Sequence, residues 1–286
     1  MSTVLAVTSQ GLVLPSQDGQ TPLAHVLTDP GSQSLEAALA EWQDLLDRYG
    51  YVVVPFSTAT STAMVRRMHT VRSLLESDRI ALVPSPLPPL GLAVLVRQLR
   101  QLSRFDFPPG VLGTAVRMLA YYVHAGAMLN TVAKLDHVPV SLKAHAKSWM
   151  PGSQFGVLAH PEPQLVKIAP GASLRGPEYA TTMVMAKGQL ATEWVRELAT
   201  TWPVQALEEV DVPQESAKWW GTGKLVEFTA AIPDVGTLHQ LVSSVRRQRC
   251  RWCGVELLGE SCAFCSAPLV PPENQVSSGG VVHNSA

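Results

Sequence analysis

Four cysteines near the C-terminus constrain this chain more than any other feature. They form two Cys-x-x-Cys pairs, Cys250 with Cys253 and Cys262 with Cys265, and eight residues separate the pairs. A Cys-x-x-Cys turn directs two sulfurs at one point, so two such turns supply the four thiolates of a tetrahedral Zn²⁺ site. With sulfur at all four positions, the metal keeps no open position for catalysis. The sequence therefore predicts a structural Zn²⁺ as cofactor.

The two pairs also resemble each other. Each reads Cys-x-aromatic-Cys, with Trp252 in the first pair and Phe264 in the second, and Gly254 follows the first pair, where a tight turn favours positive φ. Residues 248–268 resemble a small four-cysteine zinc ribbon. The resemblance implies a short hairpin whose folding free energy comes from metal binding, because so short a segment cannot bury a core. Zinc ribbons occur in proteins of unrelated function, so the resemblance leaves the activity open.

Three other chemistries for the cysteines stay open at this point: two disulfides, redox-active dithiols, or a rubredoxin-like iron centre. Residues 1–15 lack the basic start and long apolar run of a secretory signal, so we expect a cytoplasmic protein with reduced thiols. The closeness of the two pairs favours shared coordination over independent redox pairs. The ligand set alone does not distinguish iron from zinc.

The rest of the chain falls into two patterns. Residues 1–150 alternate short apolar runs with amphipathic stretches, which predicts an α/β domain built on β-α-β units. Residues 151–245 predict an α+β domain of β-α-β-β-α-like order, with the boundary at Pro151. Residues 246–270 then hold the ribbon, and residues 271–286 have the composition of a disordered tail.

Apolar periodicity places the individual elements. Continuous apolar runs at 51–56 and 80–84 are typical of strands buried on both faces. In the first half we expect strands at 4–7, 12–14, 51–56 and 80–84, and helices at 35–48, 63–76, 90–102, 110–134 and 141–147. In the second half we expect strands at 155–159, 165–169, 181–185, 204–212 and 224–232, and helices at 189–200 and 235–245.

Arginines surround the first cysteine pair. Arg246, Arg247, Arg249 and Arg251 lie within six residues, next to Trp252. Basic side chains beside an aromatic ring can bind phosphates and stack on bases, so these five residues form a candidate site for nucleic acid or another partner. Charge compensation of a zinc–thiolate centre explains them equally well. The net charge of −1 provides no overall field that would attract nucleic acid.

A second candidate site lies where the predicted parallel strands end. Residues 57–62 read Ser-Thr-Ala-Thr-Ser-Thr between a strand and a helix, and residues 85–91 follow the next strand. Ligands of α/β sheets bind at this edge, and a helix N-terminus attracts anions. A glycine-rich phosphate loop is missing from the sequence, however, and helix capping explains the hydroxyl residues equally well.

Composition and the missing motifs complete the prediction. Hydrophobic residues make up 46% of the chain and charged residues only 16%, which suits a surface partly covered by other subunits. The sequence contains no catalytic motif that we recognise. We therefore predict a non-catalytic binding or assembly protein, without membrane contact, that docks onto a protein or nucleic-acid partner through its ribbon. The alternative is an enzyme with a nucleotide or phosphate ligand on the N-terminal α/β unit and a purely structural zinc.

Overall fold

A four-stranded parallel sheet organises the first part of the chain. The computed structural model describes residues 3–16, 18–139 and 152–269, and its first sheet has the strand order β2-β1-β3-β4. The strands are β1 (Thr3–Val7), β2 (His25–Val26), β3 (Tyr51–Ser57) and β4 (Ile80–Ser85). All three neighbouring pairs are parallel. This confirms the predicted β-α-β unit, because parallel neighbours require a crossover.

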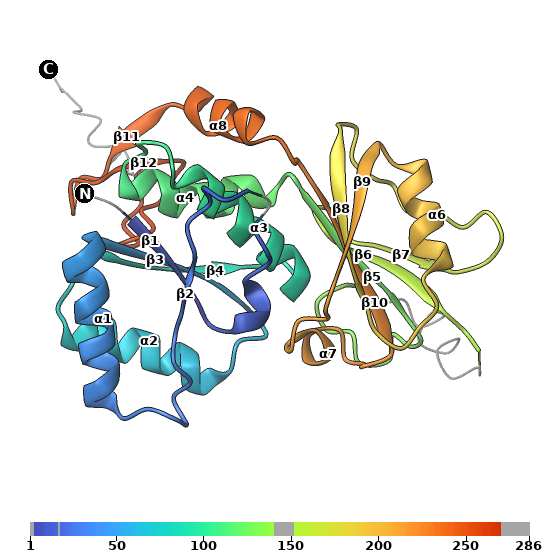
Figure 1. Cartoon of the computed structure of the whole chain (residues 1–286), viewed down its shortest axis with the longest axis horizontal. Helices are drawn as coiled ribbons and strands as arrows, with labels where there is room; N and C mark the ends of the chain where they lie inside the picture. Colours follow the sequence, from blue (N-terminus) through green and yellow to red (C-terminus); the bar gives the residue numbers. More distant parts are fainter. Residues whose placement is uncertain (1–2, 17, 140–151, 270–286) are drawn as a thin grey trace, which may run out of the picture.

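Helices cover both faces of this sheet (Figure 1). Alternate side chains of β1, β3 and β4 pack on one face against α1 (Leu35–Tyr49) and α2 (Thr62–Leu74). The intervening side chains pack on the other face against α3 (Pro89–Leu102) and α4 (Pro109–Ala120). The strands are thus buried on both sides, which explains their continuous apolar sequence.

A six-stranded mixed sheet forms the second part, with the strand order β7-β6-β5-β10-β8-β9. Its strands are β5 (Val123–Leu129), β6 (Phe155–His160), β7 (Gln164–Lys167), β8 (Thr181–Lys187), β9 (Val204–Val210) and β10 (Leu225–Ala231). Only β8 and β9 pair in parallel. Apolar side chains of α6 (Glu193–Thr201) cover one face of this sheet (Figure 1).

Helix α3 joins the two sheets. All of its residues are buried, because it packs against β3 on one side and against β5, β8 and β10 on the other. A Cβ atom on Gly91 would lie only 2.9 Å from the Cβ of Ala125, so this close approach to β5 requires glycine. Arg97 adds an ion pair in which one nitrogen, Nη1, lies 2.8 Å from both carboxylate oxygens of Glu208 on β9.

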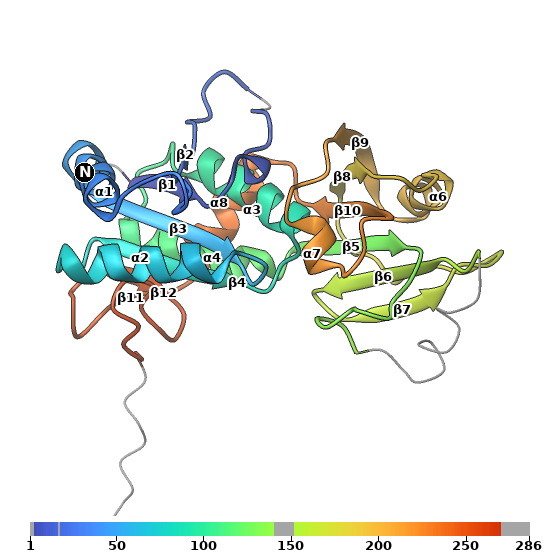
Figure 2. The ribbon, with the colours of Figure 1, turned by 90° about the horizontal axis from the view of Figure 1, so that it is seen from below.

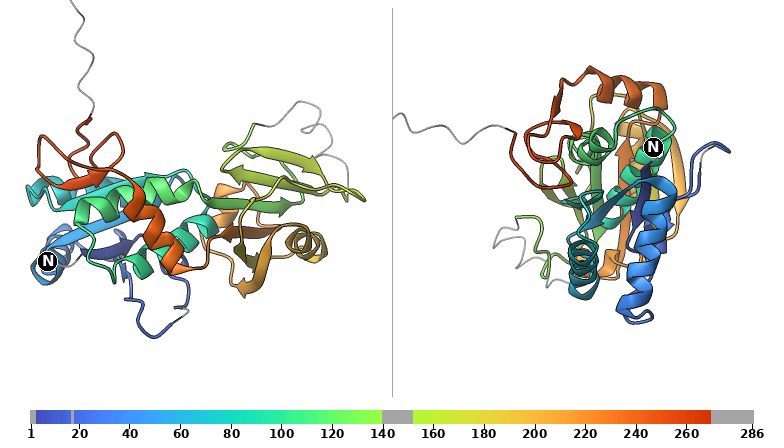
Figure 3. Two further views of the ribbon diagram at one scale, coloured as in Figure 1. Left: turned by 90° about the horizontal axis from the view of Figure 1, so that it is seen from above. Right: turned by 90° about the vertical axis from the view of Figure 1, so that its left-hand side faces the viewer.

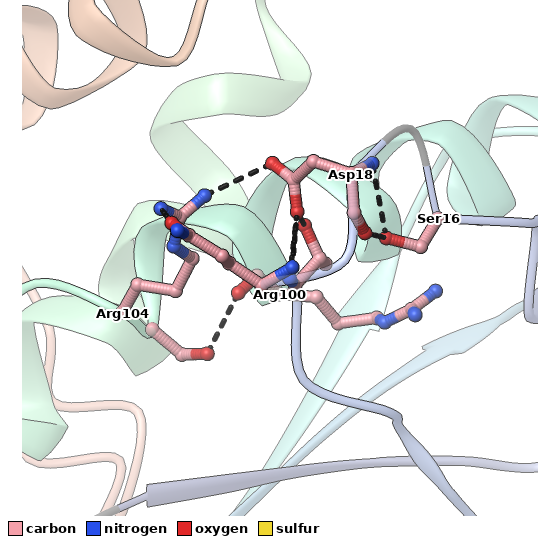
Figure 4. Close-up of polar contacts among 7 residues, drawn as sticks. Ser16, Asp18, Arg100 and Arg104 are labelled. Carbon is pink, nitrogen blue, oxygen red and sulfur yellow. Dashed lines mark hydrogen bonds and ion pairs between the residues drawn. The ribbon is translucent and has the colours of Figure 1, made fainter.

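Two further arginines fasten an N-terminal loop to α3 and the turn that follows it (Figure 4). Arg100 is almost fully buried and donates to the carbonyl oxygens of Leu14 (2.9 Å) and Pro22 (2.7 Å). Arg104 forms an ion pair of 2.9 Å with Asp18. Burial and the nearby Arg97 lower the pKa of Arg100. Carbonyl oxygens thus hold the buried Arg100 guanidinium.

The expected helix at 110–134 is wrong in its second half. Helix α4 ends at Ala120, and β5 pairs antiparallel with β10 and β6 in the middle of the second sheet. A strand buried on both faces is as apolar as a buried helix, so periodicity could not separate them. The second sheet therefore begins well before the predicted boundary at Pro151.

Two smaller predictions also need correction or fall outside the structure. The expected strand at 12–14 is instead the end of a 3₁₀ helix, η1 (Gln10–Leu12), followed by a loop. The expected helix at 141–147 and the expected tail at 271–286 lie outside the described residues. No helix within the described ranges is long and apolar enough to cross a membrane.

The cysteine segment packs against the main body. Helix α8 (Val235–Ser244) leads into β11 (Arg247–Arg249) and β12 (Glu256–Leu258), which form a two-stranded antiparallel hairpin. Figure 3 shows this hairpin lying beside α4. Leu257, Leu258 and Phe264 belong to the same apolar core as α3 and α4. The apolar side chains of the predicted ribbon thus help to fill the core around α3 and α4.

Candidate functional site

The four predicted metal ligands come together in the structure. The Sγ atoms of the four cysteines all lie within 4.8 Å of one another, with 3.5 Å between Cys250 and Cys265 and 3.6 Å between Cys253 and Cys262. A zinc–sulfur bond of about 2.3 Å in a tetrahedron separates neighbouring sulfurs by about 3.8 Å, whereas a disulfide requires about 2.05 Å. The geometry fits a four-thiolate metal site, and all four cysteines are free.

The two cysteine turns have matching backbones. The amide of Gly254 donates to the carbonyl of Cys250, and that of Ser266 donates to the carbonyl of Cys262, both at 3.0 Å. Both turn residues have positive φ, 75° at Gly254 and 61° at Ser266. The second pair thus adopts the turn of the first without a glycine, at some conformational cost.

The arginines beside the cysteines differ in their contacts within the chain. The side chain of Trp252 is 84% exposed. Arg247 is engaged within the chain, since it lies 5.8 Å from the ring centroid of Phe107 and 3.9 Å from the carboxylate of Glu256. Arg246, Arg249 and Arg251 are exposed. These residues line none of the three cavities described below.

The cysteine cluster also lies far from the edge at which parallel sheets bind ligands. Phe264 packs edge-on against Tyr51, the first residue of β3, with 5.7 Å between the ring centroids. The hairpin therefore covers the amino-terminal edge of the parallel sheet, whereas ligands bind at the carboxyl edge. The four-cysteine cluster therefore lies at the opposite edge of the sheet from the expected ligand position.

A polar cavity of about 260 Å³ lies at the opposite, carboxyl edge. We call it the hydroxyl cleft. Part of its polar lining follows the strands β1, β2 and β3, namely Thr8, Ser9, Asp29, Thr60 and Ser61. The rest comes from α7 (Ser216–Trp219) and the two residues before it, namely Gln214, Glu215 and Lys218. Figure 2 shows α7 between the two sheets, close to the end of β3. The cleft is thus built by both parts of the fold.

Unsatisfied oxygens mark this cavity. Six buried side-chain oxygens have no hydrogen-bond partner among the described residues, and four of them line the hydroxyl cleft. These four are Thr8 Oγ1, Ser9 Oγ, Thr60 Oγ1 and Glu215 Oε2. Each unpartnered buried oxygen costs about 1–3 kcal/mol, so four of them at one place favour a bound polar group.

Two other cavities, one larger than the hydroxyl cleft and one of similar size, are not lined by unpartnered oxygens. A groove of about 730 Å³ runs between residues 10–15 and 209–213, and none of the unpartnered oxygens lines it. A cavity of about 270 Å³ lies beside His124, where Tyr179 is bonded to the carbonyl of Tyr122 and lies 3.3 Å from His124 Nδ1. Burial, together with His160, lowers the pKa of His124 to about 4, so this histidine is neutral at pH 7.

The predicted hydroxyl run at 57–62 is divided between capping and the cleft. Ser57 accepts from the amide of Ala59 at 3.1 Å, and Ser61 caps α2 by accepting from the amide of Met64 at 3.2 Å. Thr60 forms no such bond, and its side chain lines the cleft. One hydroxyl of the run is thus available to a ligand, while two of its neighbours shape the backbone.

The other predicted anion position, residues 85–91, is closed. The first turn of α3 bonds to a carboxylate from within the chain, because the amide of Leu90 donates to Glu227 on β10 at 2.9 Å. Ser216 of α7 donates to the other carboxylate oxygen of Glu227. Burial raises the pKa of Glu227 to about 7 against the opposing effect of these hydrogen bonds. A phosphate therefore finds this helix N-terminus occupied.

An apolar cluster adjoins the hydroxyl cleft. Ala59 lines the cleft and also belongs to a buried cluster with Val132, Leu135, Trp219 and Trp220. Trp219 and Trp220 follow directly on the cleft residue Lys218 in sequence, and Lys218 bonds to the carbonyl of Ala59 at 2.8 Å. The hydroxyl cleft and this apolar cluster thus meet at Ala59.

Sequence reasoning missed most of this site. Thr8, Asp29 and Thr60 each follow a parallel strand, so the strand-end rule could have indicated all three once β1 and β2 were placed. Glu215 and Lys218 come from a part of the chain more than 150 residues away, and no local pattern predicts their approach.

Comparison with known proteins identifies the fold. No protein-family model matches the sequence, and no curated protein does. Among solved structures, the chain is similar to the DegV family protein Cg2579 from Corynebacterium glutamicum, with a TM-score of 0.57 and 10% identity over 82% of this chain and 98% of that one. It is also similar to a fatty-acid-binding DegV family protein from Thermus thermophilus, with a TM-score of 0.56 and 11% identity over 81% of this chain and 100% of that one.

A third similar structure is the fatty-acid-binding DegV family protein SAG1342 from Streptococcus agalactiae, with a TM-score of 0.51 and 16% identity over 82% of this chain and 100% of that one. These likenesses overturn the prediction of a docking or assembly protein that acts through its ribbon, since they concern the two-sheet body rather than a ribbon module. The two sheets of this chain, with α3 between them, have the fold of DegV-family structures.

Proposed function

We propose that the protein binds one amphipathic lipid with an acyl chain, and that the polar end of the lipid enters the hydroxyl cleft. The observation that carries the proposal is the convergence of four unpartnered buried oxygens on one cavity. Similar structures described as fatty-acid-binding DegV family proteins support an acyl ligand.

The size of the cleft fits a polar end group rather than a whole lipid. Its volume of about 260 Å³ lies below the range of about 300–1,000 Å³ that is usual for complete small-molecule sites. The acyl chain therefore lies beyond the cleft, and Ala59 marks the direction, since this residue also belongs to the apolar cluster around Trp219 and Trp220. A long chain would have to displace part of that cluster.

The cysteine cluster holds a structural Zn²⁺ in this proposal. Its sulfur separations match four-thiolate coordination, and its position at the far edge of the sheet keeps it away from the lipid. The metal fixes the hairpin whose apolar side chains complete the core around α4.

Two threonine substitutions, Thr60→Val and Thr229→Val, test the lipid site. Thr60→Val removes a buried hydroxyl that has no partner, so the free energy of unfolding should stay the same or rise by up to about 1 kcal/mol. The same change should weaken lipid binding about two- to tenfold, because it removes one hydrogen bond to the polar end. Urea unfolding and calorimetric titration with an acyl lipid give the two values.

Thr229→Val is the matched control. Its hydroxyl is also buried without a partner among the described residues, but it lies on β10 and lines none of the three cavities described above. It should keep or raise stability in the same way and leave lipid binding unchanged. Equal binding by wild type, Thr60→Val and Thr229→Val would place the polar end elsewhere and contradict the proposal.

A further inference from the structure

One carboxylate restricts which polar end the hydroxyl cleft accepts. Glu215 Oε2 is buried, lines the cleft and has no hydrogen-bond partner among the described residues. An ionised carboxylate only accepts hydrogen bonds, whereas the hydroxyls of Thr8, Ser9 and Thr60 both donate and accept. The three hydroxyls can therefore bind many head groups, but Glu215 selects those that carry a donor.

No cation offsets Glu215 within the described chain. Lys218 lies one helical turn later, but its ammonium group bonds to the carbonyl of Ala59, and the two side chains form no ion pair. The remaining charged residues nearby are acidic, because Asp29 also lines the cleft and Glu227 lies close enough to interact with Glu215. A free carboxylate in this place would meet two like charges on the lining and one cation that is already bonded.

The amino end of α2 is the feature that would favour an anion. Ser61 already occupies one amide of its first turn, that of Met64, and the amide of Val65 donates to the carbonyl of Ser61. The attraction of a helix N-terminus for an anion is about 0.3–1 kcal/mol. An unpartnered buried carboxylate oxygen on Glu215 costs about 1–3 kcal/mol, so α2 does not compensate for it.

We infer that the polar end is an uncharged group with hydrogen-bond donors, such as the hydroxyls of a monoacylglycerol, rather than the carboxylate of a free fatty acid. This inference rests on the proposed lipid site and specifies its ligand. A hydroxyl donates to Glu215 and also bonds to Thr60, so it satisfies both unpartnered oxygens together. A carboxylate satisfies Thr60 and leaves Glu215 without a donor.

The test compares two lipids with the same acyl chain on the zinc-loaded full chain. Monopalmitoylglycerol and palmitate are titrated separately at pH 8 in the presence of a weak calcium and magnesium chelator, below the concentration at which either lipid forms micelles. We expect monopalmitoylglycerol to bind at least about tenfold more tightly, in line with a hydrogen bond to a charged acceptor. Glu215→Gln should remove most of this preference, chiefly by strengthening the binding of palmitate.

Glu197→Gln on α6 is the matched control, because Glu197 is exposed and lies outside the cleft, and it should keep the full preference. Tighter binding of palmitate than of monopalmitoylglycerol by wild type would overturn the inference and leave the lipid site standing. A preference that survives in Glu215→Gln would overturn the role of Glu215. Binding of neither lipid would contradict the proposed function itself.

Discussion

The two aromatic residues of the cysteine pairs should differ sharply in their effect on stability. Phe264 and Trp252 occupy equivalent positions in the sequence, yet Phe264 is 2% exposed and Trp252 is 84% exposed. Phe264 packs against Tyr51 and lies near Gly113 of α4. The structure therefore places one aromatic ring in the core and the other in water.

The expected magnitudes follow from this difference. Phe264→Ala removes a fully buried ring and leaves a cavity, which costs about 3–5 kcal/mol. A domain of ordinary stability has about 5–15 kcal/mol in total, so this loss is a large fraction. Trp252→Ala removes little buried area and should change the free energy of unfolding by at most about 0.5 kcal/mol.

Urea unfolding followed by circular dichroism measures both changes on zinc-loaded protein. Metal analysis serves as the control, because neither substitution removes a sulfur ligand and both variants should keep the zinc content of wild type. Equal free energies of unfolding for the two variants would refute the packing of the hairpin against α4. So would a Trp252→Ala variant that is the less stable of the two.

Three further predictions concern the rest of the molecule. Burial raises the pKa of Glu227 in the folded protein to about 7 from an ordinary 4.5. This group should therefore lower the free energy of unfolding by up to about 3 kcal/mol as pH rises from about 4.5 to about 7. Glu227→Gln should abolish that pH dependence in urea unfolding. Zinc analysis should give about one ion per chain, and Cys262→Ser should lower both the zinc content and the unfolding temperature of the whole body. Glu208→Gln should lower the free energy of unfolding by about 2–4 kcal/mol, because it leaves the largely buried Arg97 without its counter-ion, whereas the same change at the exposed Glu197 should have little effect.

The sequence predicted most of the parallel-sheet unit because its signals are local. Ser34 begins α1 by accepting from the amide of Ala37, and Gly50 ends it with a φ of 80°. The buried runs that became β3 and β4 are bounded by polar or turn residues, so their strand character could be read directly. Mixed α/β architecture was therefore predictable from short-range pattern alone.

The second sheet and the cleft depend on contacts between distant residues. In β5, Gly126 lies so close to β6 that a Cβ atom there would be 2.3 Å from the carbonyl oxygen of Val157, but the sequence shows only a glycine in an apolar run. Glu215 and Lys218 meet Thr60 through the packing of α7 beside the end of β3. Secondary-structure propensity and hydrophobic periodicity contain no information on such long-range contacts.

The cysteine segment shows the same limit on a smaller scale. The spacing of the four cysteines was enough to predict that their sulfurs come together, because the constraint lies within sixteen residues. The burial of Phe264 and the exposure of Trp252 could not be predicted, because both depend on which side of the hairpin faces α4.

A crystal structure of the protein with monopalmitoylglycerol would test the central claim most directly. We predict electron density for the glycerol group in the hydroxyl cleft, with its oxygens about 2.7–3.2 Å from Thr60 Oγ1 and Glu215 Oε2, and an acyl chain that passes Ala59 toward Trp219 and Trp220. Density for the lipid beside His124 or in the groove at residues 209–213, with an empty hydroxyl cleft, would contradict the account.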